Sequence, residues 1–191
     1  MTGLSISCLG SFHVLLWEED LSSQFDTDKT RALLIYLAVE ASRSHRREHL
    51  AGLLWSDLPG QKALHNLRQT LSCLRKVLRE DQQPLGSPVL LVSRDTIQIN
   101  PAAKIWVDVN EFQNRLSAAL GCTDEGKPCS PDGKLPVRDM QRALAIYQGR
   151  FLDQFYLDDS NLFEEWAALQ REELNCRAIE GLSLLSEYHE R

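Results

Sequence analysis

The chain has 191 residues, enough for one large domain or two small ones, and its formal net charge is −6. Hydrophobic residues make up 43% of it and charged residues 25%, which is typical of a globular protein and excludes a disordered one. No apolar run approaches the roughly 20 residues of a membrane span, and the first residues lack the basic and apolar parts of a signal peptide. We therefore expect a cytoplasmic protein that folds around a hydrophobic core and does not contact a membrane.

The charge is unevenly distributed along the chain. From Lys29 to Arg79 there are ten Lys and Arg residues against three acidic ones, a local balance of +7. From Ile105 to Arg191 nine basic residues stand against sixteen acidic ones, a balance of −7. Such a division between two halves indicates a nucleic-acid-binding unit joined to a second, different unit.

Metal-binding and redox patterns are weak in this sequence. The five cysteines lie far apart and form no C-x-x-C pair, so they favour a reducing compartment. His45, Glu48 and His49 do spell H-x-x-E-H, the order of an inverted zinc-protease motif. However, a helix that begins after His45 would not bring both imidazoles to one metal, and the two arginines between them would repel it. We therefore expect no metal, no cofactor and no enzymatic activity, which metal analysis of the purified protein can test.

The first elements are predicted from hydrophobic spacing and turn residues. Residues 4–17 contain short apolar runs around a Gly-Ser pair, which predicts two short strands joined by a turn. Residues 29–41 are almost wholly apolar and follow Asp28, a candidate N-cap, so a buried helix is expected there. A second helix is expected at about 46–55, where leucines recur at three- and four-residue spacing, and a Pro-Gly pair follows it.

Residues 61–80 predict a long amphipathic helix. Its apolar residues fall in one sector of about 140° on a helical projection. The opposite face carries groups that can donate hydrogen bonds and no carboxylate: His65, Arg68, Gln69, Ser72, Lys76 and Arg79. Arg and Lys suit phosphates or guanine edges, Gln suits adenine, and a helix fits the major groove, which is about 12 Å wide. A merely solvated face is the alternative, but such a face usually mixes charges of both signs.

Two β-rich runs within residues 89–100 predict a hairpin with Arg94 at its tip. Three helices closed by a hairpin describe a winged helix, whose wing reaches the adjacent groove or the DNA backbone. An exposed turn arginine without a ligand is the alternative for Arg94. Arg46, Arg47 and Lys62 lie at helix starts near the same end of the fold, where helix N-termini and basic side chains both attract phosphate.

The second half predicts helices alone, at about 108–120, 137–149 and 161–191, with a Gly/Pro/Asp-rich loop at 121–136. Its aromatic residues are more typical of a core than of a partner groove: Phe151, Phe155, Tyr156, Phe163 and Trp166. Its acidic helices are either a solvated face or a surface for basic partners.

The fold class predicted is therefore an α+β winged helix-turn-helix domain, followed by an all-α, tetratricopeptide-like helical domain. The domains are expected at residues 1–104 and 105–191, and the second domain ends early, so we expect a fragment of a longer chain.

Several runs resemble one bacterial family. KTRALLIYLAVEA, RREHLAGLLW and LRQTLSCLRKVL resemble the OmpR-type winged helix of SARP-type transcriptional activators. VDVNEF, ALAIYQGRFLDQF and FEEWAALQREEL resemble the bacterial transcriptional activator domain that follows it in that family. The resemblance implies binding to directly repeated promoter sites, often as a side-by-side homodimer, and recruitment of RNA polymerase through its sigma or alpha subunit. It also implies that Arg68, Gln69, Arg75 and Lys76 lie in the recognition helix, and that longer relatives add an ATPase and sensor repeats.

The sequence thus predicts a transcriptional activator that reads the major groove of double-stranded promoter DNA with helix 61–80. The predicted DNA-binding residues are Arg46, Arg47, Lys62, His65, Arg68, Gln69, Ser72, Arg75, Lys76, Arg79 and Arg94. The alternatives are a protein-interaction scaffold and the output module of a larger ATPase-type signalling regulator. Salt dependence separates DNA binding from the scaffold, because counterion release makes phosphate contacts sensitive to salt.

Overall fold

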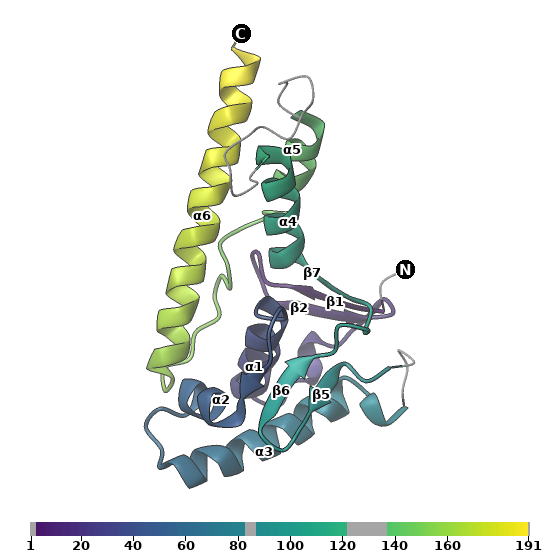
Figure 1. The fold of residues 1–191 in the computed structure, drawn as a ribbon, viewed down its shortest axis with the longest axis vertical. Coiled ribbons are helices and arrows are strands. Elements are labelled where there is room, and N and C mark those ends of the chain that lie inside the picture. Colours follow the sequence, from purple (N-terminus) through teal and green to yellow (C-terminus); the bar gives the residue numbers. More distant parts are fainter. Residues whose placement is uncertain (1–2, 83–86, 122–136, 191) are drawn as a thin grey trace.

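The computed structural model describes residues 3–82, 87–121 and 137–190 and consists of a mixed α/β part followed by a helical part (Figure 1). This order of elements confirms the fold class predicted from the sequence. The α/β part contains two small sheets and three helices, and the helical part contains three more helices among the described residues.

A four-stranded sheet opens the chain, with the strand order β3-β2-β1-β7. β1 (Leu4–Ser7) and β2 (His13–Leu16) are the two predicted strands and are antiparallel, and β3 (Glu19–Asp20) pairs antiparallel with β2. β7 (Ile105–Val107) lies parallel to β1, although it follows the whole winged helix in sequence. Every second residue of β1 and β2 is buried, as expected when one face of a sheet covers the core. A short 3-10 turn, Ser22–Gln24, leads from this sheet to the helices.

The first helix begins at a cap that differs from the prediction, and the second begins close to its predicted start. α1 (Asp28–Val39) is the expected buried helix, and eight of its twelve residues are buried. Thr27, not Asp28, caps it: the Thr27 hydroxyl accepts a backbone N–H of the first turn, while the Asp28 carboxylate pairs with Arg31. α2 (Arg47–Leu54) begins after a short strand and buries four leucine or alanine residues of one face.

α3 (Gly60–Val77) is the long amphipathic helix of the prediction. Its buried residues are Ala63, Leu67, Thr70, Leu71, Leu74 and Val77. The helix ends at Val77 rather than at residue 80, because Arg79 adopts a left-handed conformation with φ 54°. A 3-10 turn, Glu80–Gln82, then leads the chain away from the helix axis.

The wing is a three-stranded sheet of order β4-β6-β5 rather than the predicted two-stranded hairpin. β5 (Leu90–Val92) and β6 (Thr96–Ile99) are antiparallel, with Arg94 in the turn between them. β4 (His45–Arg46) pairs with β6 immediately before α2 begins. The start of α2 is therefore held against the wing.

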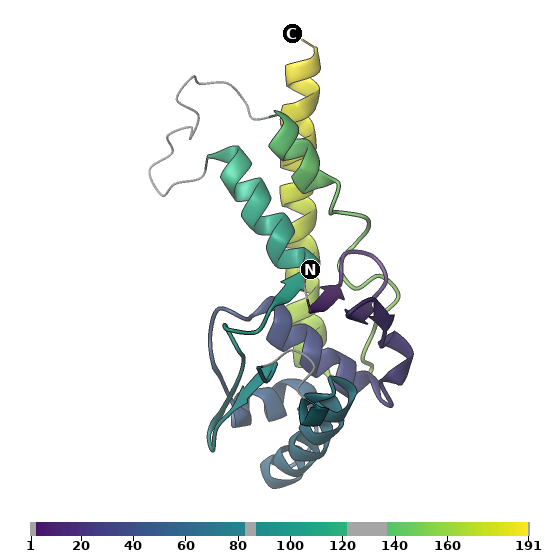
Figure 2. The ribbon, with the colours of Figure 1, turned by 90° about the vertical axis from the view of Figure 1, so that its right-hand side faces the viewer.

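The helical part contains α4 (Asp108–Leu120), α5 (Val137–Leu144) and α6 (Asn161–His189). α4 packs on α5, and α6 contacts α4, α5 and α2. Figures 1 and 2 show α6 running alongside both parts of the molecule, which its length of about 44 Å permits at 1.5 Å per residue. The loop predicted at 121–136 lies outside the described residues, except for Gly121, which caps α4 with φ 65°.

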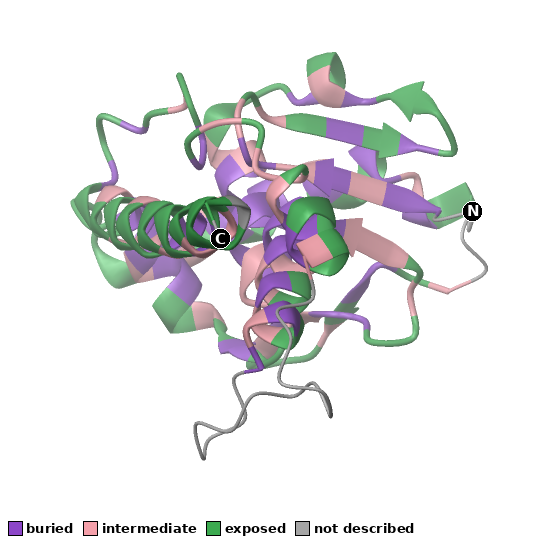
Figure 3. Ribbon diagram, turned by 90° about the horizontal axis from the view of Figure 1, so that it is seen from above, coloured by how far each residue is buried: buried purple, intermediate pink, exposed green. Residues whose placement is uncertain are grey.

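Buried side chains gather between the sheets and the helices, while the outer side of α6 is exposed (Figure 3). Among the aromatic residues predicted to pack, Phe151 and Phe163 are fully buried, and Phe155 and Trp166 are partly buried against the core. Tyr156 is the exception, with 64% of its surface exposed. No helix in the described part of the chain is both long and apolar enough to cross a membrane.

The two predicted domains, residues 1–104 and 105–191, are joined by buried hydrogen bonds, and their boundary stays a prediction. Asp108 Oδ2 accepts the backbone N–H groups of Cys8 and Leu9, both at 2.7 Å. Burial raises the pKa of the Asp108 carboxyl, although these backbone hydrogen bonds act in the opposite direction. The end of β1 is thereby fixed to the first turn of α4.

Candidate nucleic-acid interface

The exposed face of α3 carries five of the predicted contact residues, all of them exposed: His65, Arg68, Gln69, Ser72 and Lys76. Arg68 and Lys76 form no ion pair or side-chain hydrogen bond with any other described residue. His65 and Gln69 lie one turn apart and share a hydrogen bond, with 3.1 Å between the two Nε2 atoms. The two free cations are therefore available to a ligand outside the chain.

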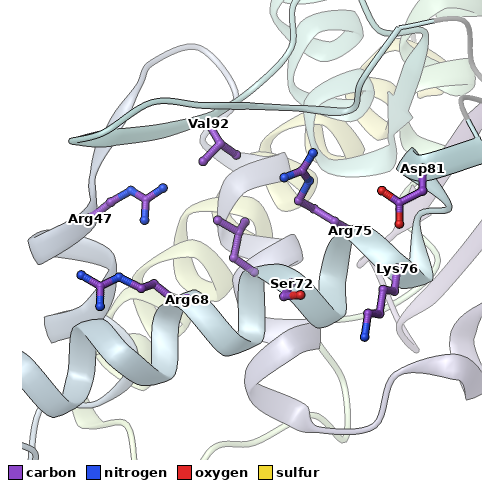
Figure 4. A pocket seen from close by; sticks show the side chains of 8 residues that line it. Arg47, Arg68, Ser72, Arg75, Lys76, Asp81 and Val92 are labelled. Carbon is purple, nitrogen blue, oxygen red and sulfur yellow. The ribbon is translucent and has the colours of Figure 1, made fainter.

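A pocket of about 300 Å³ lies between α3, the start of α2 and the wing strand β5 (Figure 4). Its lining residues are Arg47, Arg68, Leu71, Ser72, Arg75, Lys76, Asp81 and Val92. Figure 4 shows Arg47 and Arg68 at one end of the pocket and Arg75 and Lys76, with Asp81, at the other. Four cationic side chains against one carboxylate make this pocket attractive to an anion.

Arg75 is held in place within this site. Its Nε donates a hydrogen bond to Glu80 Oε2 at 2.7 Å, and 48% of its side chain remains exposed. The other carboxylate oxygen, Glu80 Oε1, accepts the backbone N–H of Leu90 at 2.8 Å. One buried carboxylate therefore bonds to both α3 and the wing.

Arg79 differs from the other residues of the predicted donor face. It lies beyond the end of α3, and its guanidinium forms an ion pair with Glu19 of β3. These hydrogen bonds from Arg79 lower the pKa of the exposed Glu19 carboxyl. Arg79 thus links the β2-β3 hairpin to the end of α3, and Glu19 partly neutralises its charge.

The remaining predicted contact residues surround α3. Arg47 fixes the wing turn: its backbone N–H donates to the Asp95 carbonyl at 2.9 Å and its Nε to the Ser93 carbonyl at 3.2 Å. Arg94, at the tip of the same turn, is exposed. Arg46 on β4 and Lys62 in the first turn of α3 are also exposed.

Sequence reasoning missed the carboxylates at the C-terminal end of α3. No acidic residue lies on α3 itself, as predicted, but Glu19, Glu80 and Asp81 surround its end. Glu80 and Asp81 directly follow Arg79 in the sequence and could have been included in the site. Glu19 is 60 residues away from its partner and has no local signal.

The H-x-x-E-H motif takes part in packing. His45 is 4% exposed, and its Nε2 lies 3.1 Å from the Glu40 carbonyl oxygen. His49 Nε2 forms a hydrogen bond with the Tyr36 hydroxyl at 2.9 Å. His45 lies before α2 and His49 in its first turns, as the sequence predicted. Within the described residues, no three His, Cys, Asp or Glu side chains are arranged to hold a metal ion.

Among solved structures, EmbR of Mycobacterium tuberculosis in complex with a low-affinity phosphopeptide is similar to this chain. The chain shares the fold of the matched part of EmbR. The TM-score is 0.64 at 22% sequence identity, and the match covers 93% of this chain. It covers 44% of the EmbR chain, so the present chain spans less than half the length of that protein. No family model matches the sequence, and no curated protein matches it.

Proposed function

We propose that this chain is a sequence-specific DNA-binding transcriptional activator that inserts α3 into the major groove. The observation that carries the proposal is the pocket between α3 and the wing, which is lined by Arg47, Arg68, Arg75 and Lys76 although the chain as a whole is acidic. Arg68 and Lys76 have no charged partner among the described residues, and such a concentration of cations suits a polyanion, because each phosphate contact releases condensed counterions.

Nine of the eleven predicted residues can be divided by role in this proposal. Arg68 and Gln69 lie on the exposed middle of α3 and would read base edges, since Arg suits guanine and Gln suits adenine. The exposed cations around the helix would contact phosphates and set the register of the helix: Arg46, Lys62, Lys76 and Arg94. His65 and Ser72 can donate to either group, and Arg79 contributes least because Glu19 neutralises it.

The fold shared with EmbR supports a regulatory function. Recruitment of RNA polymerase through its sigma or alpha subunit, and side-by-side homodimers on directly repeated promoter sites, are part of the proposal because the sequence resembles that family. The helical part carries the acidic half of the chain, which favours contacts with basic protein partners over contacts with DNA.

Promoter binding after Arg68→Ala and Lys76→Ala tests the proposal. Footprinting upstream of the chain's own operon defines the DNA, and titrations between 50 and 200 mM salt give the affinity. We expect Arg68→Ala to weaken binding by about 1–3 kcal/mol. Lys76→Ala should reduce the salt slope by about 0.9.

Arg138→Ala is the matched control, because Arg138 is an exposed cation on α5, at the opposite end of the molecule from α3 (Figure 1). It should leave both affinity and salt slope unchanged. Wild-type affinity in both α3 variants overturns the proposal.

A protein-interaction scaffold is the second candidate, and one feature of α6 favours it. Leu169, Ile179 and Leu182 expose 71%, 54% and 56% of their surfaces on this helix. An apolar partner bound there would remain bound at high salt. DNA binding through six or more phosphates would instead weaken about a thousandfold between 50 and 200 mM salt.

A further inference from the structure

We infer that Glu80 is a positioning residue for DNA recognition, which orients Arg75 of α3 and fixes the wing relative to that helix. The inference rests on the proposed function. The Glu80 side chain is 2% exposed, and its two oxygens bond to two different parts of the site: Arg75 Nε at 2.7 Å and the Leu90 N–H at 2.8 Å.

The backbone explains how this carboxylate reaches both partners. The left-handed Arg79 turns the chain sharply after α3, so that the following residue faces back toward the last turns of the helix. Leu90 begins β5, whose third residue, Val92, forms a wall of the cationic pocket. A single side chain thus bonds both to the recognition helix and to the first residue of β5.

A buried carboxylate is a poor choice if stability alone is required. Removing a charge from water is costly, and well-packed apolar residues often replace a buried ion pair without loss of stability. Here both carboxylate oxygens of Glu80 are hydrogen-bonded, and its partner on α3, Arg75, is half-exposed and lines the pocket. This arrangement is better suited to fixing a side chain for an external ligand than to filling a core.

The geometry of the bond determines which donors Arg75 keeps. Glu80 occupies Nε, so both terminal amino groups of the guanidinium remain available. Arg75 lines the pocket between α3 and the wing and also the neighbouring pocket beside β5 and β6. A guanidinium fixed in this way can donate two hydrogen bonds to one phosphate or one guanine edge. A lysine carries its three donors on a single atom, so an ammonium held by Glu80 could not also present two parallel donors to one phosphate or guanine edge.

A double-mutant cycle with Glu80→Gln and Arg75→Ala tests the inference on footprinted promoter DNA. The glutamine can still accept the Leu90 N–H, but its amide nitrogen cannot accept from Arg75 Nε. We expect Glu80→Gln to weaken binding roughly tenfold when Arg75 is present, as for loss of a hydrogen bond to a charged group. In the Arg75→Ala background the same change should leave affinity unchanged or increase it, because it only removes a negative charge near DNA.

Asp81→Asn is the matched control, since Asp81 is an exposed neighbouring carboxylate that lines the same pocket without an ion pair to a described residue. It should strengthen binding slightly, which is opposite in sign to Glu80→Gln. An equal loss from Glu80→Gln in both backgrounds, or no loss in either, overturns the positioning role while the proposed function stands. Absence of specific binding by the wild-type chain overturns the proposed function itself.

Arg75→Lys keeps the inference testable if Glu80→Gln does not fold. Arg75 is half-exposed, so this variant should retain the fold and the net charge. It should bind promoter DNA several-fold more weakly than wild type, because an ammonium held by Glu80 cannot present two parallel donors to DNA. Wild-type affinity in Arg75→Lys contradicts the inference.

Discussion

The cationic pocket between α3 and the wing and the contact between α1, α2 and α6 use basic residues in opposite ways. In the pocket, Arg68 and Lys76 are exposed and have no charged partner among the described residues. At the contact with α6, the Lys29 side chain is 14% exposed and pairs with Asp159 at 2.7 Å. Its Nζ also bonds to the Leu54 carbonyl and the Ser160 hydroxyl. The burial and pairing of Lys29 therefore contrast with the exposure of Arg68 and Lys76, which have no charged partner among the described residues.

The contact with α6 also combines aromatic and polar bonds. Trp166 of α6 packs edge-on against the Tyr36 ring, with 4.9 Å between centroids. Its indole N–H donates to Glu40 Oε1 at 3.1 Å. Both partners belong to the end of α1, so α6 holds the winged helix directly, without an intervening linker. Substitutions at the contact with α6 should therefore change stability, and substitutions in the pocket should change DNA binding.

The largest expected effect on stability comes from Trp166→Ala. It removes a partly buried ring and leaves Glu40 without its indole donor, so we expect the free energy of unfolding to fall by about 2–3 kcal/mol. Urea denaturation measures this fall, and the salt slope of DNA binding should stay at its wild-type value.

Leu169→Ala, on the exposed side of the same helix, is the control and should change stability by less than about 0.5 kcal/mol. If Trp166→Ala changes the salt slope but not the stability, the contrast between the two regions fails.

A pair of lysine variants sharpens the contrast with a smaller effect. Lys29→Met removes a mostly buried cation and its bonds to α2 and to the segment before α6, so we expect a loss of stability of about 1–2 kcal/mol. Lys76→Met should change stability by less than about 0.5 kcal/mol and reduce the salt slope by about 0.9. Urea denaturation and salt titration of both variants give four values. If both variants changed the stability and the salt slope by the same amounts, the two lysines would not be functionally distinct.

The part of the fold that depends on local spacing was predictable from the sequence. The apolar and polar faces of α3 follow from residues three and four positions apart, so the buried stripe and five of the six exposed donors were predicted correctly, while Arg79 lies beyond the end of the helix. The β5-β6 hairpin likewise follows from two β-rich runs around a turn. The N-cap of α1 was wrong by one residue, because Thr27 and Asp28 are both good caps and Arg31 engages the second of them.

Features that depend on distant partners were not predictable. β4 has only two residues and exists as a strand because β6, some 50 positions later, pairs with it. The ion pair between Glu19 and Arg79 likewise joins segments that no local pattern connects. The double role of Glu80 requires the position of Leu90 in the folded wing. The sequence therefore identified the cations of the candidate site, but not the carboxylates that orient two of them.

The smallest expected effect is a pH dependence from His45, which lies between the two regions because β4 pairs with the wing and its ring packs on Tyr36. Burial lowers the pKa of His45 from its ordinary value of 6.5, and the nearby Arg43 and His49 act in the same direction. The Glu40 carbonyl oxygen and carboxylate act in the opposite direction.

Because the folded state resists protonation of His45 more than the unfolded state does, its contribution to stability is complete above pH 6.5 and falls as the pH decreases toward the lowered folded pKa. His45→Gln keeps a donor for the Glu40 carbonyl and does not titrate. We therefore expect the stability difference between wild type and His45→Gln to shrink between pH 8 and pH 5, as measured by urea denaturation at each pH. A constant difference between wild type and His45→Gln would mean that the buried imidazole does not weaken the fold on acidification.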